Sequence, residues 1–267
     1  MNQRLAVLGA GNMGEAVLAG ALSAGWASAD VVATVRTEAR AQHLRETYQV
    51  ATTSDNVTAV RGAGLVLVAV KPKDVGALLD EIAPGVDPGA VVVTVAAGHP
   101  ASFYEQRLPA GTAVVRTVPN TPAAIGAGIT AIAPGAAATD SDLEAVEHLF
   151  AGTGAVVRTA EKDLDAVTAI SGSGPAYIFY VADALAEAGV LLGLTRDVAR
   201  RLATQTLLGA SRLMDESGEH PVLLREKVTS PGGTTAAALR ALDDGGVRAS
   251  FLAAATAARD RARALGG

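Results

Sequence analysis

The chain has 267 residues, a net charge of −5, no cysteine, and 49% hydrophobic but only 3% aromatic residues. The lack of cysteine excludes disulfides, thiolate chemistry and sulfur-bound metals, and a pI of about 5.4 gives no basic surface for nucleic acid. No apolar run approaches the roughly 20 residues of a membrane span and no export signal precedes the first strand, so we expect a cytoplasmic protein without membrane or nucleic-acid partners.

The first element is an apolar strand over residues 5–8, which runs into a Gly-x-Gly-x-x-Gly loop and a helical pattern over residues 16–22. In such a loop Gly9 permits the tight turn, Gly11 lets a pyrophosphate approach the backbone, and Gly14 lets helix and strand pack closely. The N-terminus of the helix offers N–H groups to the phosphates. The stretch therefore predicts a dinucleotide-binding site.

A second strand is expected over residues 30–35, and it ends in Arg36 and Thr37, with Arg40 one helical turn further. In NAD-binding folds an acidic residue at this position accepts hydrogen bonds from the adenosine ribose. Here no acid is present, and a guanidinium can instead hold a 2′-phosphate by paired hydrogen bonds. The pattern favours NADPH as the cofactor, with NADH as a weaker alternative.

Short apolar runs predict the remaining strands of the first part of the chain. These runs cover residues 65–70, 90–95, 113–118, 128–133 and 155–158, with a helix start at residues 54–57 and a helix over residues 140–150. Alternation of apolar strands with helices is typical of a doubly wound parallel sheet.

Two loops follow these strands at the edge where such sheets bind ligands, because the crevice lies outside the carboxyl ends of the strands. Lys71 and Pro72 follow one strand, where the lysine either meets a cofactor or only caps the strand end. Asn120 lies between Pro119 and Pro122, whose rings fix the backbone and so aim the side chain.

Beyond about residue 159 only helical patterns remain. They cover residues 177–192, 195–214, 234–242 and 247–265. We therefore expect an α/β protein in which a Rossmann-type doubly wound sheet over residues 1–160 is followed by an all-α domain over residues 161–267. The helix over residues 177–192 is apolar on almost every side, so it must be buried nearly all round. A single chain offers few helices to cover it, which predicts a homodimer.

A second motif lies between two of these helices and reads Ser-Pro-Gly-Gly-Thr-Thr over residues 230–235. It is either an ordinary helix–helix turn or a cradle for a carboxylate. In the second interpretation Ser230, the N–H groups of Gly233 and Thr234, and the helix N-terminus bind the anion. The residues alone leave both interpretations open.

The motif over residues 230–235 resembles the C-terminal motif of pyrroline-5-carboxylate reductases. Stretches that resemble the same family, in the same order, cover residues 7–14, 69–72, 96–98, 116–122 and 171–176. The resemblance thus extends over essentially the whole chain. Val118 and His99 depart from the methionine and aliphatic residues that are common there, which affects only local packing.

The resemblance implies that the protein reduces the cyclic imine 1-pyrroline-5-carboxylate to L-proline with a nicotinamide hydride, the last step of proline biosynthesis. An imine can arrive already protonated, so a strong general acid is less necessary, in keeping with the lack of an obvious catalytic acid–base pair. The resemblance gives Thr235 the catalytic task of a hydrogen bond to the imine nitrogen. It also implies helix-exchanging homodimers, often assembled into decamers, with active sites between subunits.

The implied substrate site consists of Ser230, Gly232, Gly233, Thr234, Thr235 and Asn120. The implied cofactor site consists of Gly9, Gly11, Asn12, Met13, Gly14, Arg36, Thr37, Asn56, Ala69, Val70, Lys71, Pro72, Ala97, Gly98 and Asn120. No metal site is expected, because the histidines are scattered without ligand spacing.

Two alternatives are less consistent with the residues. In β-hydroxyacid dehydrogenases a catalytic lysine follows a Gly-x-Gly stretch by four residues, and the same count from Gly174 gives Ile178, which cannot serve. A non-catalytic NADP-sensing regulator would keep the nucleotide fold but would have no need of the cradle at residues 230–235.

Overall fold

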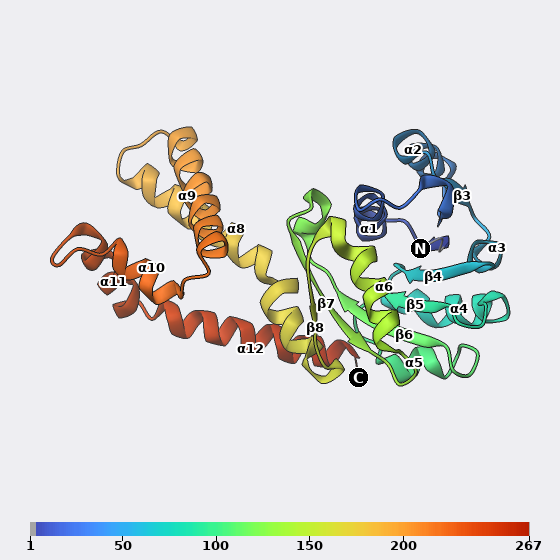
Figure 1. Ribbon diagram of the computed structural model, residues 1–267. Helices are drawn as coiled ribbons and strands as arrows, with labels where there is room; N and C mark the ends of the chain where they lie inside the picture. The colour runs from blue at the N-terminus through green and yellow to red at the C-terminus, as the bar shows by residue number, and fades with distance from the viewer. Residues whose placement is uncertain (1–3, 267) are drawn as a thin grey trace. The chain divides into compact units, whose positions relative to one another are not determined.

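The computed structural model describes residues 4–266, which form two compact units. The sheet unit contains the chain up to Ser173 and its end from Ala258, and the helical unit spans Gly174–Ala257 (Figure 1). Residues 161–173 group with the sheet because Leu164 is buried against Ala131 and Ala133. The domain boundary after residue 160 thus stays a prediction, whereas contacts within the chain divide it after Ser173.

The sheet unit is built on one eight-stranded sheet with the order β3-β2-β1-β4-β5-β6-β7-β8. The strands are β1 Arg4–Leu8, β2 Val31–Thr34, β3 Ala51–Thr53, β4 Ala63–Val68, β5 Val91–Thr94, β6 Ala113–Val118, β7 Gly128–Pro134 and β8 Gly154–Arg158. All neighbouring pairs are parallel except β6 and β7. The predicted Rossmann-type doubly wound sheet is confirmed.

Two features of the sheet differ from the sequence prediction. Strand β3 was not expected, since it is short and none of its residues is buried. Strands β7 and β8 run opposite to the other six, because residues 119–127 between β6 and β7 are fewer than the dozen or so that a parallel crossover needs.

Helices cover both faces of the sheet, as Figure 1 shows. They are α1 Asn12–Ser23, α2 Glu38–Tyr48, α3 Asn56–Val60, α4 Pro72–Ile82, α5 Ala101–Glu105, α6 Asp140–Phe150 and α7 Leu164–Val167. The alternation along β1 separates two cores, because successive strand residues point to opposite faces. Leu5 and Val7 pack with α1 and α6, whereas Ala6 and Leu8 pack with α3 and α4.

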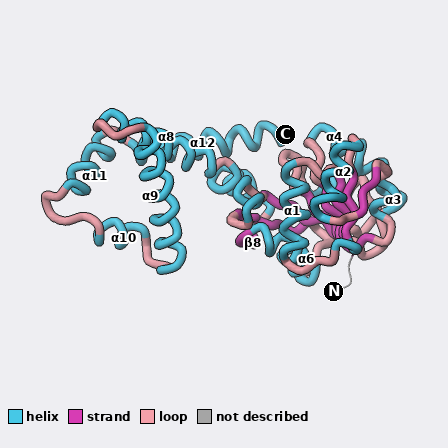
Figure 2. Tube along the Cα trace, turned by 90° about the horizontal axis from the view of Figure 1, so that it is seen from above, coloured by secondary structure: helices cyan, strands magenta, loops and turns pink. Residues whose placement is uncertain are grey.

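The helical unit contains no strand among its described residues (Figure 2). Its helices are α8 Gly174–Leu191, α9 Arg196–Ser217, α10 Pro221–Lys227, α11 Thr234–Asp244 and the first part of α12 Val247–Gly266. Helices α8 and α9 pack closely at Gly189, where a Cβ would lie only 2.8 Å from the Cβ of Ala199. None of the described helices is long and apolar enough to cross a lipid bilayer.

The helical unit buries few side chains within one chain. Among its described residues, the buried hydrophobic ones are Ala186, Ala199 and Ala203. Within the single chain α8 is not buried all round, since Phe179 is 66% and Tyr180 77% exposed, as expected if a second chain covers it. The apolar residues of α8 thus find too few partners in their own chain.

Candidate functional site

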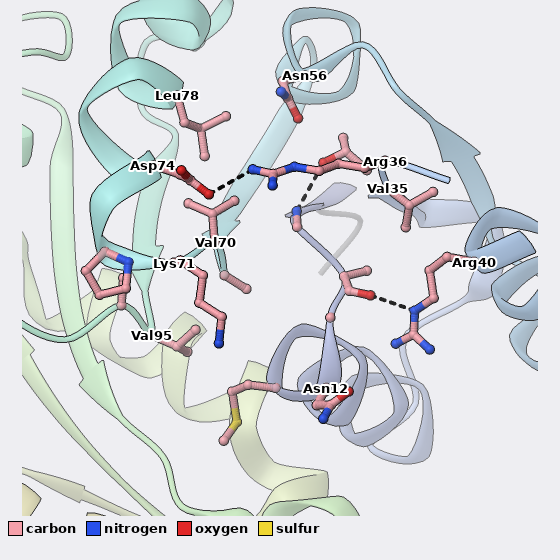
Figure 3. Close-up of a pocket in the computed structure, with 18 of the residues that line it drawn as sticks. Asn12, Val35, Arg36, Arg40, Asn56, Val70, Lys71, Asp74, Leu78 and Val95 are labelled. Carbon is pink, nitrogen blue, oxygen red and sulfur yellow. Dashed lines mark hydrogen bonds and ion pairs between the residues drawn. The ribbon is translucent and has the colours of Figure 1, made fainter. Parts of the chain in front are cut away.

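A cleft of about 1310 Å³ opens at the carboxyl ends of the strands in the sheet unit (Figure 3). It lies at the topological switch point of the sheet, where β1 has β2 as its neighbour on one side and β4 on the other. Most of the predicted cofactor residues line this cleft. They are Gly9, Gly11, Asn12, Met13, Arg36, Thr37, Asn56, Ala69, Val70, Lys71, Pro72 and Ala97.

The three glycines of the nucleotide loop have separate tasks. Gly9 has a φ of +84°, and a Cβ there would lie 2.7 Å from Cγ1 of Val70. A Cβ at Gly14 would lie 2.8 Å from the carbonyl oxygen of Gly9, so both glycines are required by the fold. At Gly11, by contrast, a Cβ would meet no described atom within 4 Å, which leaves that space for a ligand.

The N-terminus of α1 faces the same cleft. Gly11 is the N-cap of α1 and has no side chain with which to cap the helix, and Gly11, Asn12 and Met13 all line the cleft. The first-turn N–H groups and the positive end of the helix dipole are therefore available to an anion such as a pyrophosphate.

Arg36 crosses the cleft from the end of β2 to α4. Its Nη2 lies 2.8 Å from Oδ2 of Asp74, an ion pair drawn as a dashed line in Figure 3. On the same helix Glu81 accepts hydrogen bonds from Nδ2 of Asn56, at 3.2 Å to either carboxylate oxygen. The predicted cofactor residues Arg36 and Asn56 are thus both held by acids of α4, which no local sequence pattern predicts.

Arg40 is fixed against the glycine loop by Glu15 of the first turn of α1. The Arg40 Nε donates to the carbonyl oxygen of Ala10 at 2.9 Å, and its Nη2 pairs with Glu15. Glu15 also accepts from the Tyr48 hydroxyl at 3.0 Å and lies 2.8 Å from Nε2 of His43. Burial acts to raise the pKa of Glu15, but the hydrogen bonds from His43, Arg40 and Tyr48 outweigh it and lower the pKa.

Asn120 does not line the cleft, so its predicted contacts with cofactor and substrate stay a prediction. Its Nδ2 donates to the carbonyl oxygen of Ser171 at 3.1 Å, and its Oδ1 accepts from the N–H of Ile129 at 3.0 Å. The buried amide therefore ties the start of β7 to the single π-helical turn Thr168–Gly172. Its neighbours Thr121 and Ala124 line the cleft instead.

The remaining predicted cofactor residues outside the lining are Gly14, which packs the helix on the strand, and Gly98. Next to Gly98, His99 stacks on Phe103 with ring centroids 4.0 Å apart and places Nε2 3.1 Å from the carbonyl oxygen of Pro72. His99 therefore connects α5 with the start of α4. An aliphatic residue is expected at this position, so the difference affects local packing. Among the described residues, no group of three or more His, Asp or Glu is placed to hold a metal ion.

The stretch over residues 230–235 lies in the helical unit and runs into α11, which begins at Thr234. Gly232 has a φ of +67°, and a Cβ at Gly233 would collide with Oγ of Ser230. The N–H of Gly233 donates to the carbonyl oxygen of Ser230 at 3.0 Å, and Gly233 is the N-cap of α11 without a side chain to cap it. The turn therefore brings the Ser230 hydroxyl to the N-terminus of α11, but the Gly233 N–H of the predicted carboxylate cradle already has a partner in the carbonyl oxygen of Ser230, so the cradle stays a prediction.

Comparison with family models identifies two regions of the chain. A model for NADP oxidoreductases, coenzyme F420-dependent, matches residues 4–98, and a model for pyrroline-5-carboxylate reductase dimerisation matches residues 161–265. Together with the doubly wound sheet and its cleft, these matches define an oxidoreductase of the NADP type that carries a helical dimerisation domain.

Relatives over nearly the full length identify the family. Pyrroline-5-carboxylate reductase of Mycobacterium tuberculosis is 44% identical over 98% of this chain and 96% of its own. The enzyme of Corynebacterium melassecola is 42% identical over 98% of either chain. The chain belongs to the pyrroline-5-carboxylate reductase family.

Solved structures agree with this assignment. A pyrroline-5-carboxylate reductase from Coxiella burnetii covers the whole of both chains with a TM-score of 0.96 at 33% identity. A Plasmodium falciparum pyrroline carboxylate reductase with NADP bound covers 100% of this chain and 99% of its own, with a TM-score of 0.87 at 27% identity.

Proposed function

We propose that the protein reduces 1-pyrroline-5-carboxylate to L-proline with NADPH. The observation that carries the proposal is the Ser230–Thr235 loop at an uncapped helix N-terminus, in a chain whose relatives bear the name of this activity. NADPH, when bound, supplies a hydride to the carbon of the protonated C=N bond, so that the imine nitrogen becomes the secondary amine of proline. Neither alternative, the β-hydroxyacid dehydrogenase nor the NADP sensor, accounts for this loop.

The chain's own residues bind and orient the two reactants. In the sheet unit, the first-turn N–H groups of α1 hold the pyrophosphate, and Gly11 leaves it room. In the helical unit, the Ser230 hydroxyl and the Thr234 N–H group hold the substrate carboxylate, and the Gly233 N–H can join them only by leaving the carbonyl oxygen of Ser230. Thr235 accepts a hydrogen bond from the iminium N–H, so it orients the reacting carbon and stabilises the charge on the nitrogen.

The experiment that tests this function follows NADPH oxidation by absorbance, with and without 1-pyrroline-5-carboxylate. Oxidation that depends on the imine, with L-proline as the product, is the expected result. Tight NADPH binding without turnover would instead favour the sensor, and NADP⁺-dependent oxidation of a 3-hydroxy acid would favour the β-hydroxyacid dehydrogenase.

The exposed guanidinium of Arg36 favours NADPH over NADH, because it is the basic group at the end of β2 where NAD-binding folds carry an acid. We expect Arg36→Ala to lower kcat/KM for NADPH by about 10-fold and to leave that for NADH within about 2-fold, since an arginine–phosphate contact is a charge-assisted hydrogen bond. Steady-state kinetics with either cofactor measure the ratio. An unaltered ratio would place the 2′-phosphate elsewhere.

The exposed apolar residues of the helical unit favour a homodimer. Leu191 and Leu192 are 88% and 84% exposed in the single chain, in a region that matches a dimerisation model. We expect the melting temperature to rise with protein concentration, because association stabilises only the folded state. Sedimentation should give twice the mass of one chain. A melting temperature that does not depend on concentration, together with the mass of one chain, would contradict the dimer. The decamer and the cytoplasmic location stay predictions.

A further inference from the structure

We propose that Asp74 sets how strongly the cleft prefers a 2′-phosphorylated nucleotide, because it competes with the phosphate for the guanidinium of Arg36. The inference rests on the proposed function, which assigns Arg36 to the 2′-phosphate. Asp74 is then a specificity-determining residue that lies across the cleft from the residues of the sequence motif (Figure 3).

The guanidinium of Arg36 can bind either the carboxylate of Asp74 or a 2′-phosphate. Asp74 stands in the first turn of α4, and its Oδ2 is 2.8 Å from Nη2 of Arg36. The side chain of Arg36 is 81% exposed and that of Asp74 29%, so the pair lies at the open rim of the cleft, where it can separate at little cost. A guanidinium that turns its paired N–H groups to a phosphate gives up the carboxylate.

The cleft is also lined by Arg40, Glu81, Lys71 and Lys73, of which the first two are held by other side chains. Arg40 is held by Glu15 and by the carbonyl oxygen of Ala10, and Glu81 accepts from Asn56. Arg36 is thus the arginine of this cleft whose side chain is largely exposed, and its partner Asp74 is partly exposed. A nucleotide without a 2′-phosphate leaves the Arg36–Asp74 pair in place, whereas one with a 2′-phosphate must displace Asp74 from Arg36.

The test compares Asp74→Asn with the wild type by direct titration of 2′,5′-ADP, 5′-AMP, NADPH and NADH. We expect the Kd values of 2′,5′-ADP and NADPH to fall by about 2- to 5-fold, the range of an exposed ion pair, and those of 5′-AMP and NADH to stay the same. The gain should shrink as salt screens the charges.

Asp80→Asn is the matched control. It removes the same charge from the same helix, but Asp80 does not line the cleft and pairs loosely with Arg107 at 3.9 Å. Arg36→Ala combined with Asp74→Asn tests the mechanism, since without Arg36 the second change should give no gain for the 2′-phosphate. Weaker NADPH binding in Asp74→Asn would overturn the proposal, because Asp74 would then position Arg36 instead of competing for it. An equal gain in Asp80→Asn or without Arg36 would also overturn it.

These titrations separate the inference from the function on which it rests. Binding of the probes needs no turnover, so an inactive protein that shows the Asp74→Asn effect would contradict the reductase proposal but not this one. A wild type that binds 2′,5′-ADP and 5′-AMP equally would contradict the role of Arg36 and, with it, the role of Asp74.

Discussion

Gly11→Ala is expected to leave the folded protein as stable as the wild type and to weaken NADPH binding by roughly 10- to 100-fold. The backbone of Gly11 has a φ of −77°, which alanine adopts without strain, and a Cβ there meets no described atom within 4 Å. The methyl group would instead occupy the path of the pyrophosphate, and overpacking of about 1–3 kcal/mol corresponds to that loss of affinity. Thermal unfolding and a fluorescence titration with NADPH measure the two effects.

Gly14→Ala is the matched control for Gly11→Ala, because it adds the same methyl group to the same loop. A Cβ at Gly14 would lie 2.8 Å from the Gly9 carbonyl oxygen and 3.1 Å from the Cβ of Ala69. We expect this variant to lose about 1–3 kcal/mol of stability even without cofactor. If Gly11→Ala bound NADPH normally, the pyrophosphate would have to pass elsewhere, and the interpretation of the loop would be wrong.

The sequence predicted those elements whose signals are local. Helix α6 and strand β6 have the predicted bounds, since an apolar run defines β6 and a capping box of Thr139 and Asp142 begins α6. Strand β3 carries no such signal because its residues are at least partly exposed. The reversal at β7 follows from the length of a connection, which an apolar pattern does not reveal.

The sequence predicts the part of the site that the backbone of the glycine loop forms. It does not predict the ion pairs that side chains make with residues far away along the chain. A glycine loop after a buried strand must lie at the carboxyl edge of the sheet, so its place in the cleft follows from the pattern. The partners of Arg36 and Arg40 lie on other elements, at Asp74 and Glu15. The apolar composition of α8 likewise predicts that a second chain must cover it, but it does not say which residues of that chain do so.

Thr235→Ala is expected to lower kcat/KM for the imine by about 10- to 150-fold and to leave the Kd of NADPH unchanged. A hydrogen bond to a charged group contributes about 1.5–3 kcal/mol, and the loss should appear in kcat as well, since the bond holds the reacting nitrogen. Thr235 stands in the first turn of α11, where alanine is a better helix former, so the variant should remain folded. Stopped-flow kinetics and an NADPH titration measure the two quantities.

Two further variants show whether the hydroxyl of Thr235 itself is responsible. Thr235→Ser keeps the hydroxyl and should recover most of the activity. Thr256→Ala removes a hydroxyl that only donates to the carbonyl oxygen of Leu252 within α12, at 2.9 Å, and should leave the kinetics as they are. If Thr235→Ala turned over the imine at the wild-type rate, the nitrogen would be held by another group. The Ser230–Thr235 loop would then bind the carboxylate alone.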